Sequence, residues 1–212
     1  MTLIVDVKPK VIESAVVRAP YDVASAELKK NNYRLITLPQ NAQLRIEQGK
    51  DSNISQNGNY VEEGVIWRPN EKPKLVRNSP IILSASEATQ AHREGREFYP
   101  TKEQLEQSLA DSVDFPSQNT EIPTDKFGSE ELTVYAFGGE KPAQLYGEFL
   151  KDAGISKVPV WAVDKSYVDK QKSALARQLW FHGLGGDYRS GLDSSGRNLY
   201  CVNAVRGVRL VS

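Results

Sequence analysis

Few residues in this chain of 212 have the type and spacing needed for catalysis, and most of them lie near its C-terminal end. The segment His182-Gly183-Leu184-Gly185-Gly186 has the small residues that bring backbone N–H groups to a developing oxyanion in some hydrolases. Such a hydrolase also needs a G-x-S-x-G nucleophile turn, an acid and a later histidine. The sequence has no such turn and no histidine after His182, so it does not predict hydrolysis.

Metal and cofactor chemistry are equally poorly supported. The two histidines are 90 positions apart and Cys201 is the only cysteine, so a His/Cys metal site is not predicted. Asp187 and Asp193 leave a calcium site open as an alternative to two ordinary loop carboxylates. The glycine patterns of phosphate-binding loops are absent. We therefore expect no metal and no cofactor, and we expect His92 to be a solvated or helix-face residue without a catalytic role.

Composition restricts the classes of protein further. Lys+Arg and Asp+Glu number 27 each, and no apolar run is long enough to span a membrane. The sequence therefore predicts neither membrane insertion nor a dedicated nucleic-acid binder, although an arginine excess in residues 177–212 keeps the latter as a minor alternative. The start lacks the apolar stretch of a secretory signal, and the compartment stays open between the cytoplasm and a cell or virion surface.

The order of predicted elements indicates an α+β domain over residues 1–212. Period-two patterns and turn residues favour strands in the first 83 residues, and Asn57-Gly58 suits a tight hairpin turn. Helix caps and helix-forming composition then predict three helices. The expected helices cover about 84–98, 101–112 and 141–153; the expected strands include 44–46, 65–67, 132–137, 158–163, 175–181 and 204–211.

The last 32 residues have an unusual composition. Lys, Glu, Gln, Met and Trp number 15, 16, 11, 1 and 3, and all of them lie in residues 1–180. Chance would give this absence on the order of once in 10,000 chains of this composition. Free mutation of the two adenines in an AAC or AAT codon can produce every amino acid except these five. The tail thus has the composition that adenine-specific mutagenesis would leave.

Two kinds of position alternate within this tail. Apolar residues that we expect to form a buried frame are Leu179, Phe181, Leu184, Leu192, Leu199 and Val205. We also expect Trp180 to be a core residue, and Arg206 and Arg209 to make structural contacts. Between the frame positions lie side chains of no consistent chemistry, unlike a catalytic loop. We predict that these display a variable ligand-binding surface: His182, Gly185, Gly186, Asp187, Tyr188, Gly191, Asp193, Ser194, Ser195, Asn198, Tyr200, Cys201, Asn203 and Ala204.

These features resemble the variable proteins of diversity-generating retroelements, in particular their archaeal branch. Two further stretches carry the resemblance. Phe98-Tyr99-Pro100-Thr101-Lys102-Glu103-Gln104-Leu105 is similar to the L-P-T-E-x-E-W helix start of formylglycine-generating-enzyme-like folds, and Val205-Arg206-Gly207-Val208-Arg209 is similar to their closing V-R-x-V-R strand. The resemblance covers about residues 80–212. It implies a C-type lectin fold with mixed short strands, two to three helices and a variable region at 178–209, while residues 1–80 are expected to be a β-rich N-terminal elaboration.

The same resemblance limits the expected function. The cysteine pair of the formylglycine-generating enzymes and the calcium-dependent sugar motifs of animal C-type lectins are both absent. We therefore expect a binding protein and not an enzyme, with an unidentified protein or surface ligand as its partner. A monomer is the default expectation. The alternatives are a fixed-specificity interaction or structural module of a phage or cell surface and, less well supported, an enzyme related to the formylglycine generators.

Overall fold

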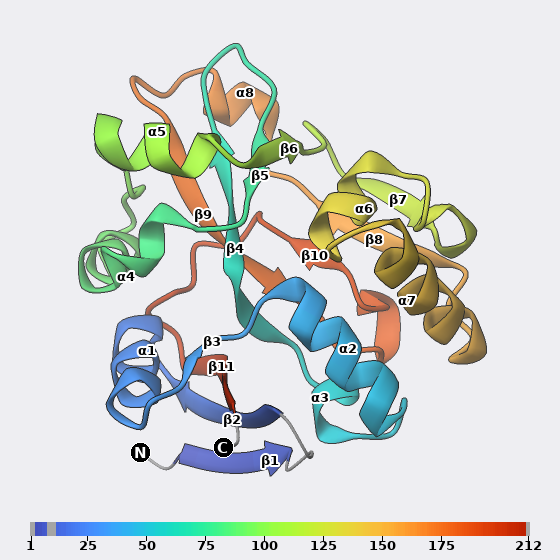
Figure 1. The fold of residues 1–212 in the computed structure, drawn as a ribbon. Helices are drawn as coiled ribbons and strands as arrows, with labels where there is room; N and C mark the ends of the chain where they lie inside the picture. The colour runs from blue at the N-terminus through green and yellow to red at the C-terminus, as the bar shows by residue number, and fades with distance from the viewer. Residues whose placement is uncertain (1–2, 8–11, 211–212) are drawn as a thin grey trace.

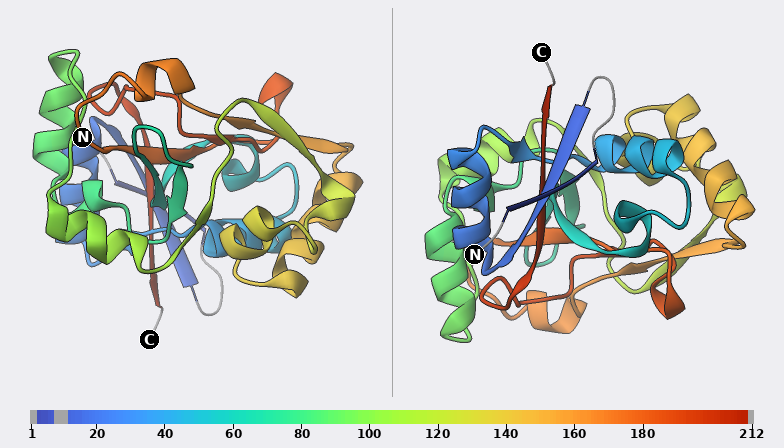
Figure 2. Two further views of the ribbon diagram at one scale, coloured as in Figure 1. Left: turned by 90° about the horizontal axis from the view of Figure 1, so that it is seen from above. Right: turned by 90° about the horizontal axis from the view of Figure 1, so that it is seen from below.

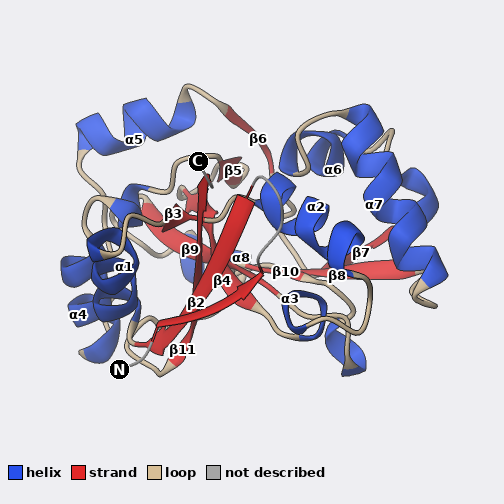
Figure 3. Ribbon diagram, turned by 60° about the horizontal axis from the view of Figure 1, so that its bottom comes forward, coloured by secondary structure: helices blue, strands red, loops and turns tan. Residues whose placement is uncertain are grey.

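The computed structural model describes residues 3–7 and 12–210, which form a mixed β-sheet flanked by helices (Figures 1 and 3). Its strand order is β1-β2-β11-β4-β9-β10-β8-β7, with β3 on β11, β5 on β4 and β6 on β5. The strands are β1 Leu3–Val7, β2 Ile12–Ala19, β3 Arg34–Leu35, β4 Asn59–Trp67, β5 Lys74–Val76, β6 Ser112–Asp114, β7 Thr120–Pro123, β8 Lys157–Trp161, β9 Leu175–Phe181, β10 Leu192–Asp193 and β11 Asn203–Leu210.

The helices gather at two sides of the sheet (Figure 2). Helices α1 and α4 contact each other on one side, α6 and α7 contact each other on the opposite side, and α2 packs against α7 and β4. Each group covers its own hydrophobic cluster. The helices are α1 Tyr21–Lys30, α2 Leu38–Gln48, α3 Asn53–Gln56, α4 Ala85–Arg93, α5 Lys102–Leu109, α6 Glu131–Ala136, α7 Glu140–Asp152 and α8 Lys165–Val168, with 3₁₀ turns η1 Pro80–Ile82, η2 Thr124–Lys126 and η3 Gly186–Tyr188.

The C-terminal strand lies inside the sheet. Strand β11 pairs antiparallel with β2 over eight residues, and touches β4 in parallel at Val205 and Tyr60. Strand β9 pairs antiparallel with β4, which carries a bulge between Tyr60 and Gly64. Both β4 and β9 are buried along most of their length, as strands covered on two faces must be. Segments from both ends of the chain thus build the sheet that supports the C-terminal loops.

The described part of residues 1–80 is less β-rich than expected, because it contains three α-helices. The expected strand at 44–46 is part of α2, whose start is fixed by a capping box between Thr37 and Gln40. Leu38, Ala42 and Arg45 are buried at helical spacing, whereas Ile46 is exposed. The apolar residues around Leu44 therefore belong to one face of an amphipathic helix. Three residues are too few to distinguish this pattern from the alternation of a strand.

The hairpin expected at Asn57-Gly58 is also wrong. Ser52 caps the short helix α3, and the chain then enters β4 without a left-handed turn. Gly58 is needed for another reason. A Cβ atom there would approach the Trp180 indole to 2.7 Å, so only glycine lets this ring lie against the backbone.

The strand expected at 132–137 is helix α6. Its β-branched and aromatic residues suggested a strand, but Leu132, Thr133 and Ala136 are buried at helical spacing. The Thr133 hydroxyl also donates to the carbonyl oxygen of Phe127 at 2.6 Å, which ties the first turn of the helix to the preceding loop.

Most elements in the second half of the chain agree with the prediction. Thr101 forms the expected capping box, and Gly154 follows α7 with a left-handed φ of 83°. The expected strands at 158–163, 175–181 and 204–211 correspond to β8, β9 and β11, although Val211 lies outside the described residues. The helix after Ser84 ends at Arg93, and Gly95, with φ 72°, follows it.

Candidate functional site

Two loops connect the last three strands, and they carry the predicted display positions. One loop runs from β9 to β10 through η3, and the other runs from β10 to β11. Seven of the predicted positions are exposed: Gly185, Gly186, Asp187, Tyr188, Ser195, Asn198 and Tyr200. Four are half-buried: His182, Asp193, Cys201 and Asn203.

Three predicted display positions are buried, and the prediction of a displayed side chain needs correction there. A Cβ atom at Gly191 would overlap the Trp161 ring. Ser194 is fully buried and donates its hydroxyl to the carbonyl oxygen of Trp161 at 3.0 Å. Ala204 is 2% exposed in β11. These positions support the loops from inside.

The expected apolar frame is confirmed. Each of its six residues is buried, with Leu184, at 8%, the most exposed of them. The expected contacts of the closing strand are present as well. Arg209 Nε pairs with Glu13 at 2.7 Å, and Arg206 donates to the Ser14 hydroxyl at 2.9 Å and to the Asn53 side-chain carbonyl at 3.2 Å.

Aromatic rings form the centre of the display surface. The ring of His182 stacks on Tyr188, with centroids 4.6 Å apart and planes 5° apart. Trp161 meets His182 edge to face at 5.0 Å and Tyr188 at 6.3 Å. Tyr188 is 56% exposed, so the stack ends in solvent. Large rings with one face free offer contact area at low entropic cost.

Trp180 lies beneath this stack. We expected a fully buried core residue, but its side chain is half-buried. Its Nε1 donates to His182 Nδ1 at 3.2 Å, and its ring meets Tyr60 edge to face at 4.9 Å. The Tyr60 hydroxyl donates to Asn198 at 2.7 Å in the following loop. A row of rings thus connects the core to both display loops. Sequence reasoning missed Tyr60 and Trp161 because they lie outside the tail.

His182, Asp193 and Ser195 lie close together at the surface, but the Ser195 hydroxyl does not face the imidazole as a nucleophile would. His182 Nε2 lies 3.5 Å from Asp193 Oδ2, but the Ser195 hydroxyl donates to Asp193 Oδ1 at 2.7 Å and not to the imidazole. Burial raises the pKa of Asp193, yet the hydrogen bonds from His182 and Ser195 outweigh it and hold this pKa below its usual value. The carboxylate is therefore an acceptor that shapes the loop.

A buried ion cluster holds the second loop. Glu97 Oε1 pairs with Arg177 at 2.7 Å and with Arg197 at 3.4 Å, and accepts the Tyr167 hydroxyl at 2.6 Å. Arg177 also donates to the carbonyl oxygen of Gly196 at 3.0 Å. Because Arg197 and Gly196 belong to the β10–β11 loop, the cluster fixes this loop to the segment after α4.

His92 lies on helix α4, as expected, but it is buried beside this cluster and is not solvated. Its side chain lies within helix α4 at 3% exposure, where burial, together with the charges of Arg177 and Arg197, lowers its pKa to about 3. A neutral imidazole is thus favoured in the folded protein. The charged neighbours of His92 in the sequence concealed its burial.

Within residues 3–7 and 12–210, no three His, Cys, Asp or Glu side chains gather as metal ligands. In the same part of the chain, no helix is both long and apolar enough to cross a bilayer.

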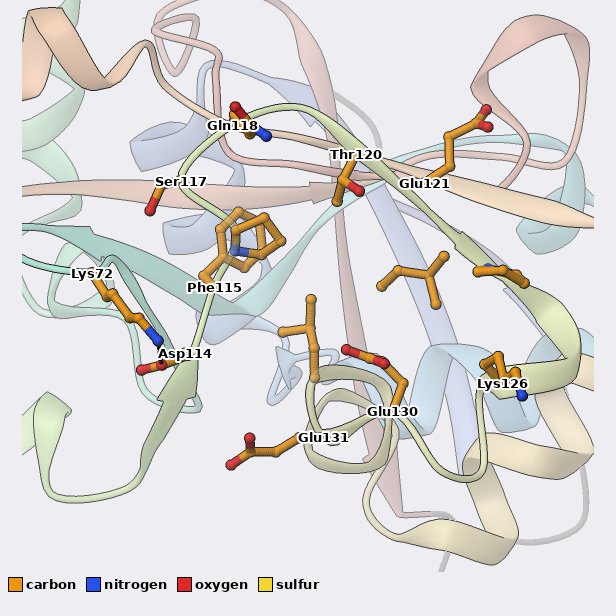
Figure 4. Close-up of a pocket in the computed structure, with 14 residues that line it drawn as sticks. Lys72, Asp114, Phe115, Ser117, Gln118, Thr120, Glu121, Lys126, Glu130 and Glu131 are labelled. Carbon is orange, nitrogen blue, oxygen red and sulfur yellow. Dashed lines mark hydrogen bonds and ion pairs between the residues drawn. The ribbon is translucent and has the colours of Figure 1, made fainter.

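An open hollow of about 580 Å³ lies next to the first display loop (Figure 4). Its floor includes Phe115 and its acidic residues include Glu130 and Glu131. Glu121 lines it too and pairs with Arg189 of the β9–β10 loop at 2.8 Å. None of the predicted display residues lines this hollow.

Comparisons with known proteins identify the fold. No protein-family model matches the chain, and no curated protein matches it. A solved structure described as "Accommodation of massive sequence variation in Nanoarchaeota by the C-type lectin fold" is similar, with a TM-score of 0.64 and 17% identity. The similarity covers 97% of this chain and 100% of that one. The chain therefore has a C-type lectin fold, as predicted.

Proposed function

We propose that this chain is a ligand-binding protein and not an enzyme, and that adenine-specific retroelement mutagenesis diversifies its C-terminal segment. In this proposal residues 178–209 display a variable surface on the C-type lectin scaffold. The partner is a protein or another surface ligand.

The observation that carries the proposal is the division of the tail between anchors and exposed positions. Frame residues such as Phe181 and Leu199 are buried, whereas half of the positions of mixed chemistry, such as Asp187 and Tyr188, face solvent. A surface that accepts many side chains must carry no residue on which folding depends. The exposed side chains of Asp187, Tyr188 and Tyr200 fit this requirement, whereas Gly186, with φ 64°, has a left-handed backbone that other residues adopt at a cost.

The chemistry of the exposed residues supports binding to a macromolecule. Tyr188 and Tyr200 are 56% and 42% exposed, and Ser195 and Asn198 lie between them in the sequence. Tyrosine with serine and asparagine is the combination that antibody paratopes use. The similar nanoarchaeal protein is described as accommodating massive sequence variation, which supports the same use of this fold here.

A fixed-specificity interaction module is the second candidate. The burial of Gly191, Ser194 and Ala204 favours it, because free variation at these positions would disturb packing. The two candidates differ in what they predict for the exposed positions. A diversified binder requires that these positions tolerate substitution and vary in nature, whereas a fixed-specificity module does not.

Paired libraries test the proposal. The first library carries NNY codons at the exposed positions; the second, matched in size, carries them at buried anchors. The exposed set is Gly185, Gly186, Asp187, Tyr188, Ser195, Asn198 and Tyr200, and the anchor set is Gly183, Ser190, Gly191, Leu192, Ser194, Leu199 and Ala204.

Protease resistance of the displayed proteins gives the folded fraction, and hen egg-white lysozyme serves as the binding probe. We expect more than about half of the first library to fold and to yield lysozyme binders, and the second to fold rarely. Loss of folding in the first library, or failure to yield any binder, would contradict the proposal.

A further inference from the structure

Arg45 is a fully buried cation that contacts no acidic side chain among the described residues. It lies on α2, and its contacts are the Tyr146 hydroxyl at 3.1 Å, the Ser190 hydroxyl at 3.0 Å and the face of Phe181 at 3.9 Å. Among the described residues, its Nε and Nη2 have no hydrogen-bond partner. Burial lowers its pKa, which reflects the cost of holding a charge there. Packing alone would be better served by an apolar side chain.

Ser190 is the point where Arg45 meets the β9–β10 loop. Its hydroxyl also lies 2.6 Å from that of Tyr146, and its N–H donates to the carbonyl oxygen of Gly183 at 2.8 Å. Ser190 and its neighbour Arg189 have left-handed φ angles of 61° and 39°. Residues other than glycine adopt this conformation at an energetic cost, so surrounding contacts must hold them in it.

The other end of the loop is fixed as well. A Cβ atom at Gly183 would overlap the carbonyl oxygen of Gln56, and the N–H of Leu184 donates to the carbonyl oxygen of Ser55 at 2.8 Å. Between these two ends, residues 185–188 are exposed. The loop therefore has fixed ends and an exposed tip.

We propose that Arg45 is a positioning residue which, through Ser190 and Tyr146, holds the β9–β10 loop in one conformation whatever side chains occupy 185–188. Its value for recognition rests on the function proposed above: a loop ordered in advance loses less entropy when a ligand binds. Arg45 is completely buried and does not itself touch a ligand.

Amide hydrogen exchange of the full chain without ligand tests the positioning. The variants are Ser190→Ala and Tyr146→Phe, and the matched controls are Ser195→Ala in the neighbouring loop and Tyr99→Phe at the surface. Each control removes a hydroxyl from a hydrogen-bonded but more exposed residue.

We expect the amides of Leu184, Ser190 and Gly191 to exchange at least about tenfold faster in both variants, and those of β9 to change less than about threefold. The controls should leave both sets unchanged. Unchanged exchange in the loop would overturn the proposal, because the contacts would then not order the loop. Equal acceleration in the loop and β9 would also overturn it, because the contacts would then stabilise the whole fold and not the loop in particular.

Binding separates this proposal from the proposed function. Library members that bind lysozyme should lose about tenfold in affinity when Ser190→Ala is added, mainly through slower association or faster release from a looser loop. If the variants loosen the loop but the libraries yield no binder, the positioning role of Arg45 would stand and the ligand-binding function would be contradicted. Unchanged affinity in a binder that uses Tyr188 would overturn the role of positioning in recognition.

Discussion

The carboxylate of Glu97 lies 2.7 Å from the guanidinium of Arg177, and both side chains are at most 3% exposed. A single acid thus neutralises a buried cation and reaches a second arginine of the β10–β11 loop. The loop is fixed by residues that lie outside the tail.

Replacing Glu97 by Gln should destabilise the protein strongly, because Arg177 would keep its charge without a partner. We expect a loss of about 3 to 5 kcal/mol in the free energy of unfolding, measured by urea denaturation. The control is Glu106→Gln, whose exposed contact with Lys102 is 3.8 Å long and should contribute almost nothing. Equal effects of the two changes would show that the buried cluster does not hold the loop.

Two glycines of the tail should respond oppositely to a methyl group. At Gly191 a Cβ atom would overlap the ring of Trp161, whereas at Gly185 the nearest atom, Gln56 Oε1, is 3.6 Å away. Gly191→Ala should therefore cost about 1 to 3 kcal/mol, and Gly185→Ala should stay within about 0.5 kcal/mol of the original protein. Thermal unfolding of both variants measures the difference. If Gly191→Ala left the free energy of unfolding unchanged, position 191 would have to be counted among the display positions.

The rings at the surface and beneath it should differ in the same way. Removing the exposed ring and carboxylate together, in Asp187→Ala with Tyr188→Ala, should lower the melting temperature by no more than about 3 °C. Trp180→Ala should cost about 2 to 3 kcal/mol, less than a fully buried tryptophan, because its ring is half-buried and packs on Tyr60. A double variant as unstable as Trp180→Ala would mean that the tip helps to hold the fold.

The buried carboxyl of Glu63 should make stability depend on pH. Burial raises its pKa to about 8, although both oxygens accept the N–H of Leu38 at 3.0 Å. In the folded protein Glu63 therefore keeps a proton that the unfolded chain releases above about pH 4.5, so stability falls as the pH rises toward 8. His92 has the opposite effect, because its pKa is lowered to about 3 in the folded protein. It makes stability fall as the pH drops below about 6.5.

Unfolding measured between pH 6.5 and 8 separates the contribution of the Glu63 carboxyl to stability from that of His92. The free energy of unfolding should fall by up to about 2 kcal/mol over this range. In Glu63→Gln the part of the slope that comes from Glu63 should vanish, while His92→Gln should leave it unchanged. A slope that survives in Glu63→Gln would assign the pH dependence to another group.

The parts of the fold that the sequence predicted are those with local signals. The capping box at Thr101 and the apolar strand 175–181 need no distant contact to be recognised. Helices α2 and α6 were mistaken for strands because short apolar alternations fit both periods, and tertiary packing decides between them. Gly58 looked like a turn residue because the ring of Trp180, 122 positions later, is invisible in a local pattern.

The site was predictable from composition but not in its details. The absence of five residue types marked the whole tail, and the apolar frame within it was recognisable. Composition does not distinguish a buried serine from an exposed one, so Ser194 and Ser195 were grouped together. The groups that hold the loops, such as Arg45 and Glu97, lie outside the tail and become visible only when the fold brings them there.

Deep sequencing of codons 178–212 in a natural population, together with the DNA flanking the gene, tests whether the tail is diversified. We expect differences concentrated at exposed positions such as Asp187, Tyr188 and Tyr200. We also expect invariance at anchors such as Ser190 and Leu199, and a nearby adenine-bearing near-copy with a reverse transcriptase gene. A uniform tail without such a copy, or variation spread equally over anchors and exposed positions, would contradict diversification and leave a C-type lectin fold of fixed specificity.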